Sequence, residues 1–219
     1  MQDISYKGQF DVHYAITVLE RQFNGVDKLN LSLCELLLQF EKDYKNTTKN
    51  AVHSKQITTD GGFQTELNNN LFESNNSAIV QLKNQLILPA INEYLTEVFS
   101  EAAAHITPYL VGWGNILGQG NWQRPHFHPT HKNLISGCYY LKIPPMQDSS
   151  EGHIEFLNPM PISINHGFSN SRKLQPAEGK LLLFPPFYMH YVHPIKSDTR
   201  RYVIAFDVLS ESPGFKLVF

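Results

Sequence analysis

The second half of the chain is a series of short apolar runs with no helical stretch between them. From residue 105 onward these runs are rich in aromatic and β-branched residues, and Gly, Pro and Asn separate them, as is typical of strands and turns. The predicted strands are residues 106–117, 123–128, 134–143, 153–157, 180–184, 188–193 and 201–209. Consecutive strands without intervening helices favour packed sheets, so this half predicts a sandwich or a jelly roll.

The first half has the periodicity of helices. Residues 27–45 repeat leucines at helical spacing after Asp27, which is a suitable N-cap. A second apolar stripe starts near Ser77 and continues to Phe99. Pro89 falls inside it, so we expect a kink or a break there. Both stripes predict helices that pack on a sheet.

Two turn-rich stretches lie between the helices, at residues 58–62 and 68–70. The resulting organisation is a single domain over residues 1–219. Its N-terminal part, residues 1–104, is expected to be mainly helical, and residues 105–219 are expected to form the β core.

Composition narrows the function classes. The net charge is −2, divided as −5 over residues 1–105 and +3 over residues 106–219. This mild positive bias suits an anionic small molecule but is far from the basic stripe of a nucleic-acid-binding protein. The two cysteines, Cys34 and Cys138, indicate buried reduced thiols and no disulfide framework.

No stretch of the sequence reaches the eighteen consecutive apolar residues that a membrane span needs. The first thirty residues lack the apolar core of a signal peptide. We therefore expect no membrane partner and a cytoplasmic location, which is the host cytoplasm if the chain is phage-encoded. No heptad pattern identifies an oligomer.

The motif His126-Phe127-His128 is the strongest chemical signal. In an extended segment, residues i and i+2 point to the same face, so His126 and His128 can present two imidazoles to one metal ion. Pro125 and Pro129 bracket the pair and restrict its backbone. His190, from a distant strand, would be the third ligand. The alternative is that these are surface histidines with ordinary hydrogen bonds, in a chain that has ten.

Four ordered segments carry a resemblance to a known family. They are residues 125–129 (PHFHP), residues 135–141 (ISGCYYL), Phe184-Pro185 with His190, and residues 201–207 (RYVIAFD). In this order they resemble the 2-oxoglutarate- and Fe(II)-dependent oxygenases, most closely a bacterial and phage branch of that superfamily. The resemblance covers about residues 105–210, and more weakly residues 61–65.

The resemblance implies a mostly β fold, a double-stranded β-helix (jelly roll) with N-terminal helices packed on it. It implies Fe(II) at His126, His128 and His190, with 2-oxoglutarate as cosubstrate and O2 as oxidant. The chain would be an oxidoreductase that hydroxylates an unidentified substrate and releases succinate and CO2. His190 is preferred over His193 because Arg201 follows His190 by eleven residues, a spacing similar to prolyl-hydroxylase-like members.

The resemblance also implies the cosubstrate contacts. Arg201 would bind the distal carboxylate of 2-oxoglutarate with its guanidinium fork. Tyr140 would donate its hydroxyl to the same carboxylate, and Asn115 would present an amide to the cosubstrate. The alternatives are that Tyr140 is a core aromatic and that Arg200 or Arg201 is a surface charge.

Two positions depart from the family pattern. His128 stands where most members have a carboxylate, which leaves the ligand set one charge more positive and makes Zn(II) or Ni(II) more plausible. Asn158-Pro159-Met160 stands where the branch often has an acidic residue, a proline and a basic residue, so a substrate contact is expected to differ.

Two other functions fit part of the pattern. The first is a cupin-type metalloenzyme that does not use 2-oxoglutarate, because Gly120 and His126-x-His128 match the start of a cupin motif. The glutamate expected after His128 is missing, since Lys132 and Asn133 occupy its place. The second is a non-catalytic jelly-roll binding module. The predicted loops 144–152 and 158–172 are candidates for substrate selection, and His131 and His193 are candidates for hydrogen-bond partners of the ligands.

Overall fold

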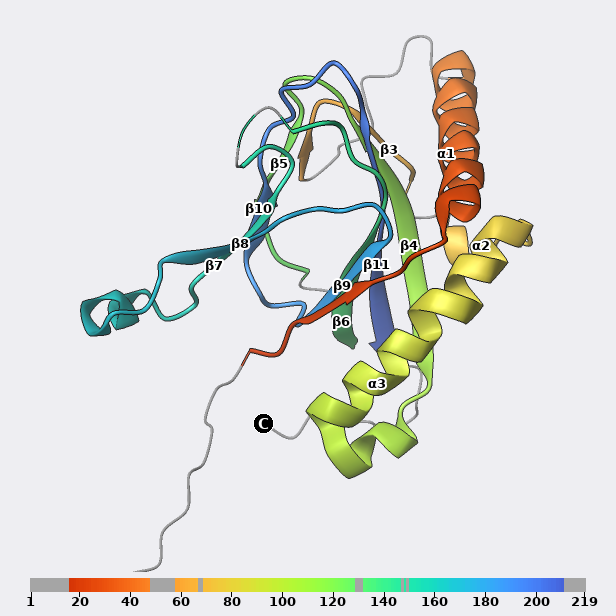
Figure 1. Cartoon of the computed structure of the whole chain (residues 1–219). Helices are drawn as coiled ribbons and strands as arrows, with labels where there is room; N and C mark the ends of the chain where they lie inside the picture. Colours follow the sequence, from red (N-terminus) through yellow and green to blue (C-terminus); the bar gives the residue numbers. More distant parts are fainter. Residues whose placement is uncertain are drawn as a thin grey trace, which may run out of the picture.

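Two antiparallel sheets face each other at the centre of the molecule (Figure 1). The computed structural model describes residues 16–47, 58–66, 69–128, 132–146, 148 and 150–210. The larger sheet has the order β1 (Leu19–Gln22), β9 (Lys180–Phe184), β6 (Asn133–Lys142), β11 (Arg201–Ser210), β4 (Pro108–Leu117) and β3 (Phe63–Gln64). The smaller has the order β2 (Thr59–Asp60), β5 (Trp122–His126), β10 (His190–Val192), β7 (Ile154–Leu157) and β8 (Ser171–Leu174). The predicted jelly roll is confirmed.

Strand β11 lies at the middle of the larger sheet and separates two cores. Successive side chains of a strand point to opposite faces. Tyr202, Ile204, Phe206 and Val208 belong to the core under the helices. Val203 and Ala205 pack in a second, smaller core between the sheets. By the same alternation, the polar side chains of Arg201 and Asp207 also face the space between the sheets.

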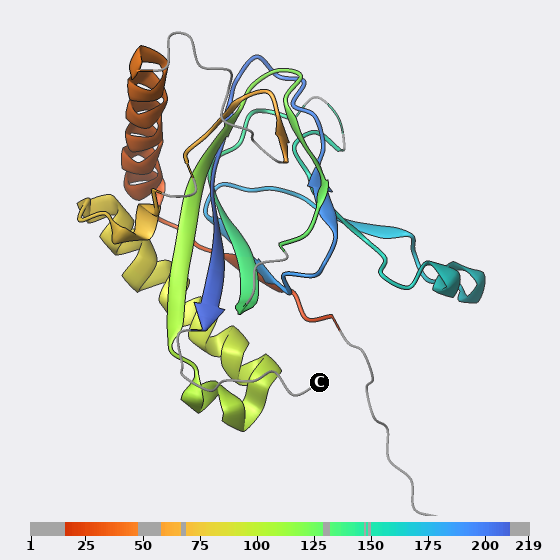
Figure 2. The ribbon, with the colours of Figure 1, turned by 180° about the vertical axis from the view of Figure 1, so that it is seen from behind.

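The helices cover the outer face of the larger sheet (Figures 1 and 2). They are α1 (Asp27–Thr47), α2 (Ser77–Gln81) and α3 (Leu88–Phe99). Leu33, Leu37 and Ile91 are fully buried or nearly so against the sheet. The predicted packing of helices on a sheet is confirmed, and none of these three helices covers the smaller sheet.

The sequence predicted a kink or a break at Pro89, and the helical structure is not broken there. A π-helical segment, η2 (Leu82–Ile87), joins α2 to α3, and Pro89 occupies the first turn of α3. A proline in a helix removes one backbone hydrogen bond and crowds the carbonyl four residues earlier. The wider π turn directly before Pro89 accommodates that defect, so one continuous rod is retained.

Four strands were not predicted: β1, β2, β3 and β8, each four residues long or shorter. The predicted turn at 58–62 contains β2, and only Gly61-Gly62 connect β2 to β3; β2 pairs with β5 in one sheet and β3 pairs with β4 in the other. Gly61 and Gly62 have φ of +74° and +73°. A Cβ on Gly62 would lie 2.5 Å from the Ile116 carbonyl oxygen, so this crossing between sheets requires glycine.

Among the described residues, no helix is both long enough and apolar enough to span a lipid bilayer. Cys34 and Cys138 are buried free thiols, as the sequence predicted.

Candidate metal centre

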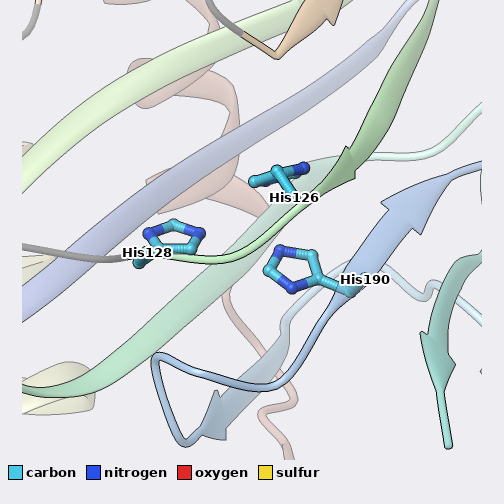
Figure 3. Close-up of side chains that lie close together, drawn as sticks. All are labelled: His126, His128 and His190. Carbon is cyan, nitrogen blue, oxygen red and sulfur yellow. The ribbon is translucent and has the colours of Figure 1, made fainter. Parts of the chain in front are cut away.

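Three histidines converge between the sheets (Figure 3). His126 ends β5, His128 follows two residues later, and His190 begins β10. The antiparallel register places His190 directly opposite His126. One ring nitrogen from each histidine lies within 4.8 Å of the others. The ring centroids of His126 and His190 are 4.3 Å apart, and each lies 5.4 Å from that of His128.

Each of the three rings has its Nδ1 atom engaged. The Nδ1 of His126 lies 2.6 Å from the Arg124 carbonyl oxygen, and that of His190 lies 2.8 Å from the Tyr188 carbonyl oxygen. Because a carbonyl oxygen only accepts, Nδ1 carries the proton in both rings. The Nδ1 of His128 lies 2.8 Å from Oδ1 of Asp207. This tautomer leaves the Nε2 lone pair of every ring available for a metal ion.

Burial keeps two of these rings neutral. Desolvation lowers the pKa of His126 to about 4, with the Arg124 carbonyl opposing the shift. It also lowers the pKa of His190 well below its ordinary value, helped by the nearby His126. A neutral imidazole is the form that binds a metal, so the unprotonated state needed for coordination is the stable one at neutral pH.

Aromatic side chains pack around the imidazoles. Trp113 stacks on His128 with ring centroids 5.9 Å apart. Phe184 and Phe156 contact His190, with centroids at 4.9 and 5.5 Å. This apolar packing holds the rings in place and lowers the local dielectric, which strengthens electrostatic interactions in the site.

A second polar group faces the same interior. Arg201, Tyr140 and Asn115 are 2%, 0% and 2% exposed. Tyr140 on β6 and Asn115 on β4 both lie opposite Val203 of β11, so the two side chains flank it on one face of the sheet. Arg201, two residues before Val203, shares that face. Its guanidinium carbon lies 5.1 Å from the centre of the Tyr140 ring.

Parts of these three side chains lack hydrogen-bond partners. Within the described residues, the Arg201 Nε, the Tyr140 hydroxyl and the Asn115 Oδ1 are buried and unsatisfied, and no carboxylate of that part of the chain forms an ion pair with Arg201. Burial raises the pKa of Tyr140 well above its usual value, so its hydroxyl keeps its proton and can donate. Unsatisfied buried polar groups are costly unless a bound molecule completes them.

The neighbouring arginine has a different role. Arg200 points to the outside, where its Nη1 donates to both carboxylate oxygens of Glu41 on α1, at 3.0 and 2.9 Å. Of the two arginines that the sequence left open as surface charges, Arg200 is therefore the one that pairs on the outer face. Arg201 is the one inside.

Two further expectations concern the neighbours of the ligands. The Nε2 of His193 lies 2.6 Å from Oε2 of Glu155, and its ring packs on Tyr191, so it faces away from the three histidines. The prediction that His193 contacts the ligands is therefore wrong, because alternation along β10 turns it to the other face. His131 and Pro129 lie outside the described residues.

Sequence reasoning missed two residues of the site, Asp207 and Trp113. Asp207 lies six residues after Arg201 on the same strand, so period-two alternation was a signal that both face the interior. Trp113 had no such signal, because its stacking on His128 depends on how β4 and the segment after β5 meet in space.

Comparison with known proteins gives one family. Residues 112–207 match the model of a family described as "Putative 2OG-Fe(II) oxygenase". This segment contains the three histidines, Arg201, Tyr140 and Asn115. No curated protein matches the sequence.

Solved structures share the fold at low identity. A prolyl-4-hydroxylase from Pseudomonas putida has a TM-score of 0.57 and 13% identity, covering 89% of this chain and 92% of its own. A Trichoplax adhaerens prolyl hydroxylase, in complex with a hypoxia-inducible-factor peptide fragment, has a TM-score of 0.55 and 13% identity, covering 90% and 84%. HygX from Streptomyces hygroscopicus, with nickel, 2-oxoglutarate and hygromycin B bound, has a TM-score of 0.55 and 13% identity, covering 90% and 83%.

Proposed function

We propose that the chain is a member of the 2-oxoglutarate- and Fe(II)-dependent oxygenase superfamily, since residues 112–207 match a family model of such oxygenases, and that it hydroxylates an organic substrate at the three-histidine centre. In that reaction O2 and 2-oxoglutarate are consumed. One oxygen atom enters the substrate C–H bond to give an alcohol, and the other enters the succinate that is released together with CO2. The observation that carries the proposal is the presence, in one interior, of a three-nitrogen cluster and a buried arginine that has no ion-pair partner among the described residues.

The histidine cluster fits a divalent transition metal. His126, His128 and His190 would hold Fe(II) through their Nε2 atoms, because each Nδ1 already has an acceptor. Three nitrogen ligands leave coordination positions for a cosubstrate and oxygen. Bound Fe(II) supplies the chemistry of oxygen activation, while the protein fixes the ligands and excludes water.

The second polar group fits the distal carboxylate of 2-oxoglutarate. Arg201 would bind it through its guanidinium, and Tyr140 would donate its hydroxyl. Asn115 would take part only through its Nδ2 donor, because its unsatisfied Oδ1 is an acceptor and cannot pair with a carboxylate. Such a carboxylate satisfies the buried donors that lack partners within the described protein, and it neutralises the Arg201 charge. The 2-oxo acid end of the molecule is then free to reach the metal.

Two competing functions are less well supported. A cupin-type enzyme without 2-oxoglutarate would not need the Arg201 Nε and the Tyr140 hydroxyl to be buried without a partner among the described residues. A non-catalytic module would not need three histidines to bring one ring nitrogen each within 4.8 Å of the others. Neither is favoured by the family match.

The test is an anaerobic titration of the apo-protein with Fe(II) and then with 2-oxoglutarate. Wild type is expected to develop the visible charge-transfer band of 2-oxoglutarate chelated to Fe(II). In Arg201→Ala, affinity for 2-oxoglutarate should fall by roughly 30-fold or more, because removing one partner of a buried charge pair costs about 2–5 kcal/mol. Arg200→Ala is the matched control, since it removes a neighbouring arginine that pairs with Glu41 outside, and it should keep the band.

Metal binding without a band in wild type would refute the use of 2-oxoglutarate and favour the cupin reading. Absence of metal binding would favour a non-catalytic module. An unchanged band in Arg201→Ala would refute the carboxylate site while leaving the metal site in place.

A further inference from the structure

We propose that Asp207 is a positioning residue of the metal centre, which restores through His128 the negative charge that a ligand set of three imidazoles lacks. The inference rests on the proposed metal site and deepens it. It concerns a residue outside the predicted ligand and cosubstrate sets.

The contact geometry is specific. Oδ1 of Asp207 lies 2.8 Å from Nδ1 of His128, on the side of the ring opposite Nε2. Ser136 of β6 lies directly opposite Asp207 in the sheet and donates to the same Oδ1 at 2.7 Å. Asn133 in turn donates to the Ser136 hydroxyl at 3.2 Å. Asp207 is thus fixed by the two central strands of the sheet, and its carboxylate fixes the orientation of the His128 ring.

The charge balance points the same way. Asp207 is 8% exposed, and a buried carboxylate is costly unless it is paired. In the described part of the chain, His128 is the one side chain that ion-pairs with it, and no Lys or Arg does. Ser136 provides a hydrogen bond but no charge. A metal ion on Nε2 of His128 would be the missing positive charge, one imidazole away from the carboxylate.

The same arrangement accounts for the histidine in the carboxylate position. Most oxygenases of this kind use two histidines and one carboxylate, so that M(II) and its protein ligands carry a net charge of +1. Three neutral imidazoles leave +2. Adding Asp207 returns the site to +1, with the negative charge moved from the metal ligand to the hydrogen-bond partner of a ligand. Such partners raise the electron-donating strength of the imidazole they contact.

The test measures Co(II) affinity by competition with a chelator, together with the visible absorption bands of bound Co(II). Asp207→Asn keeps the shape and one acceptor oxygen but removes the charge, and it should weaken Co(II) binding by about 10- to 100-fold and shift the bands. Glu155→Gln is the matched control, because Glu155 forms the same kind of carboxylate–histidine pair with His193 away from the site. It should leave Co(II) affinity and spectrum unchanged.

A second pair of variants distinguishes an electrostatic role of Asp207 from a purely structural one. In His128→Asp the carboxylate is returned to the ligand position, and Asp207 then faces another negative group. Adding Asp207→Asn in this background should leave affinity unchanged or raise it. An equal loss of affinity in both backgrounds would show that Asp207 acts only through the fold, and would overturn the proposal.

The proposed metal site and the proposed role of Asp207 can be refuted separately. If wild type does not bind Co(II), the proposed metal site is wrong and the role of Asp207 with it. If wild type binds Co(II) and Asp207→Asn binds it equally well with the same bands, the metal site stands and the role of Asp207 is wrong. Asp207→Glu, which keeps the charge, should retain more affinity than Asp207→Asn; the reverse order would also contradict the proposal.

Discussion

Single side chains in this molecule are incompletely satisfied where the ligands are proposed to bind. The Tyr140 hydroxyl and the Arg201 Nε lack partners among the described residues, although both side chains are buried. The three histidines are complete on their Nδ1 side and open on their Nε2 side. This contrast separates residues that hold the site from atoms that face a ligand.

Tyr140→Phe tests one such atom. The substitution removes the hydroxyl and keeps the ring that packs beside Arg201, so the fold should be retained. Affinity for 2-oxoglutarate should fall by roughly 10- to 100-fold, the value of about 1.5–3 kcal/mol for a hydrogen bond to a charged group. Isothermal titration of the Co(II)-loaded protein gives the affinity. The apo-protein should be no less stable than wild type, and a large loss of apo stability would instead assign the hydroxyl a structural role.

At the scale of elements, β11 organises the site. Its even-numbered residues pack under the helices and its odd-numbered residues face the interior, from Arg201 at one end to Asp207 at the other. One strand thereby connects the proposed cosubstrate contact with the residue that orients His128. Its neighbours β4 and β6 add Asn115 and Tyr140 in register.

The long elements could be predicted from the sequence because their periodicity is extensive. All seven predicted strands overlap observed ones, and α1 begins at the predicted Asp27. Strands β2 and β3 have two residues each, too few to show alternation, and they exist only because β5 and β4 offer them edges. Similarly, the π-helical segment before Pro89 could not be predicted, because no local sequence pattern indicates a π turn.

The residues of the candidate site also differ in whether the sequence could predict them. His126, His128 and His190 could be predicted because short spacing and ligand chemistry identify them, and the structure brings them together. Alternation along the strand signals that Asp207 faces the interior, but its contact with His128 is recognised only from the structure. Trp113 carries no sequence signal, because its stacking on His128 depends on how separate segments meet in space.

We predict that the stability of the protein depends on pH through Glu155 in the smaller sheet. Glu155 of β7 accepts hydrogen bonds from Ser171 of β8, from Tyr191 of β10 and from His193. Burial by itself raises the pKa of Glu155, but these hydrogen bonds outweigh it and lower the pKa to about 2. The stabilisation is therefore fully present above the unfolded pKa near 4.5, and it is lost as pH falls from there towards 2.

Urea unfolding of the apo-protein across this range measures the effect. The Glu155 contribution should reach up to about 3 kcal/mol at neutral pH. Glu155→Gln should be less stable than wild type at pH 6, and the difference should shrink as pH approaches 2. A difference that does not change between pH 6 and pH 2 would refute the linkage.

At the scale of the whole molecule, helices cover one sheet and the site lies between the sheets (Figures 1 and 2). The large core under the helices consists of apolar side chains with three tyrosines and Cys34, and it supports the larger sheet. The smaller core contains Tyr140, whose hydroxyl lacks a partner among the described residues. Metal and cosubstrate should therefore stabilise the fold by binding only its native state.

Thermal unfolding tests this linkage. Co(II) at 100 times its dissociation constant should add about 2.7 kcal/mol of stability, and 2-oxoglutarate at a similar excess should add a comparable second increment. Arg201→Ala should retain the Co(II) increment and lose most of the 2-oxoglutarate increment. If 2-oxoglutarate stabilises Arg201→Ala as much as wild type, the carboxylate site lies elsewhere.

The most direct measurement is a crystal structure of the protein grown anaerobically with Fe(II) and 2-oxoglutarate, with the iron located by its anomalous signal. We expect one iron bound by Nε2 of His126, His128 and His190, with the distal carboxylate of 2-oxoglutarate bound to the guanidinium of Arg201. Iron at another position, or 2-oxoglutarate bound without contact to Arg201, would contradict it.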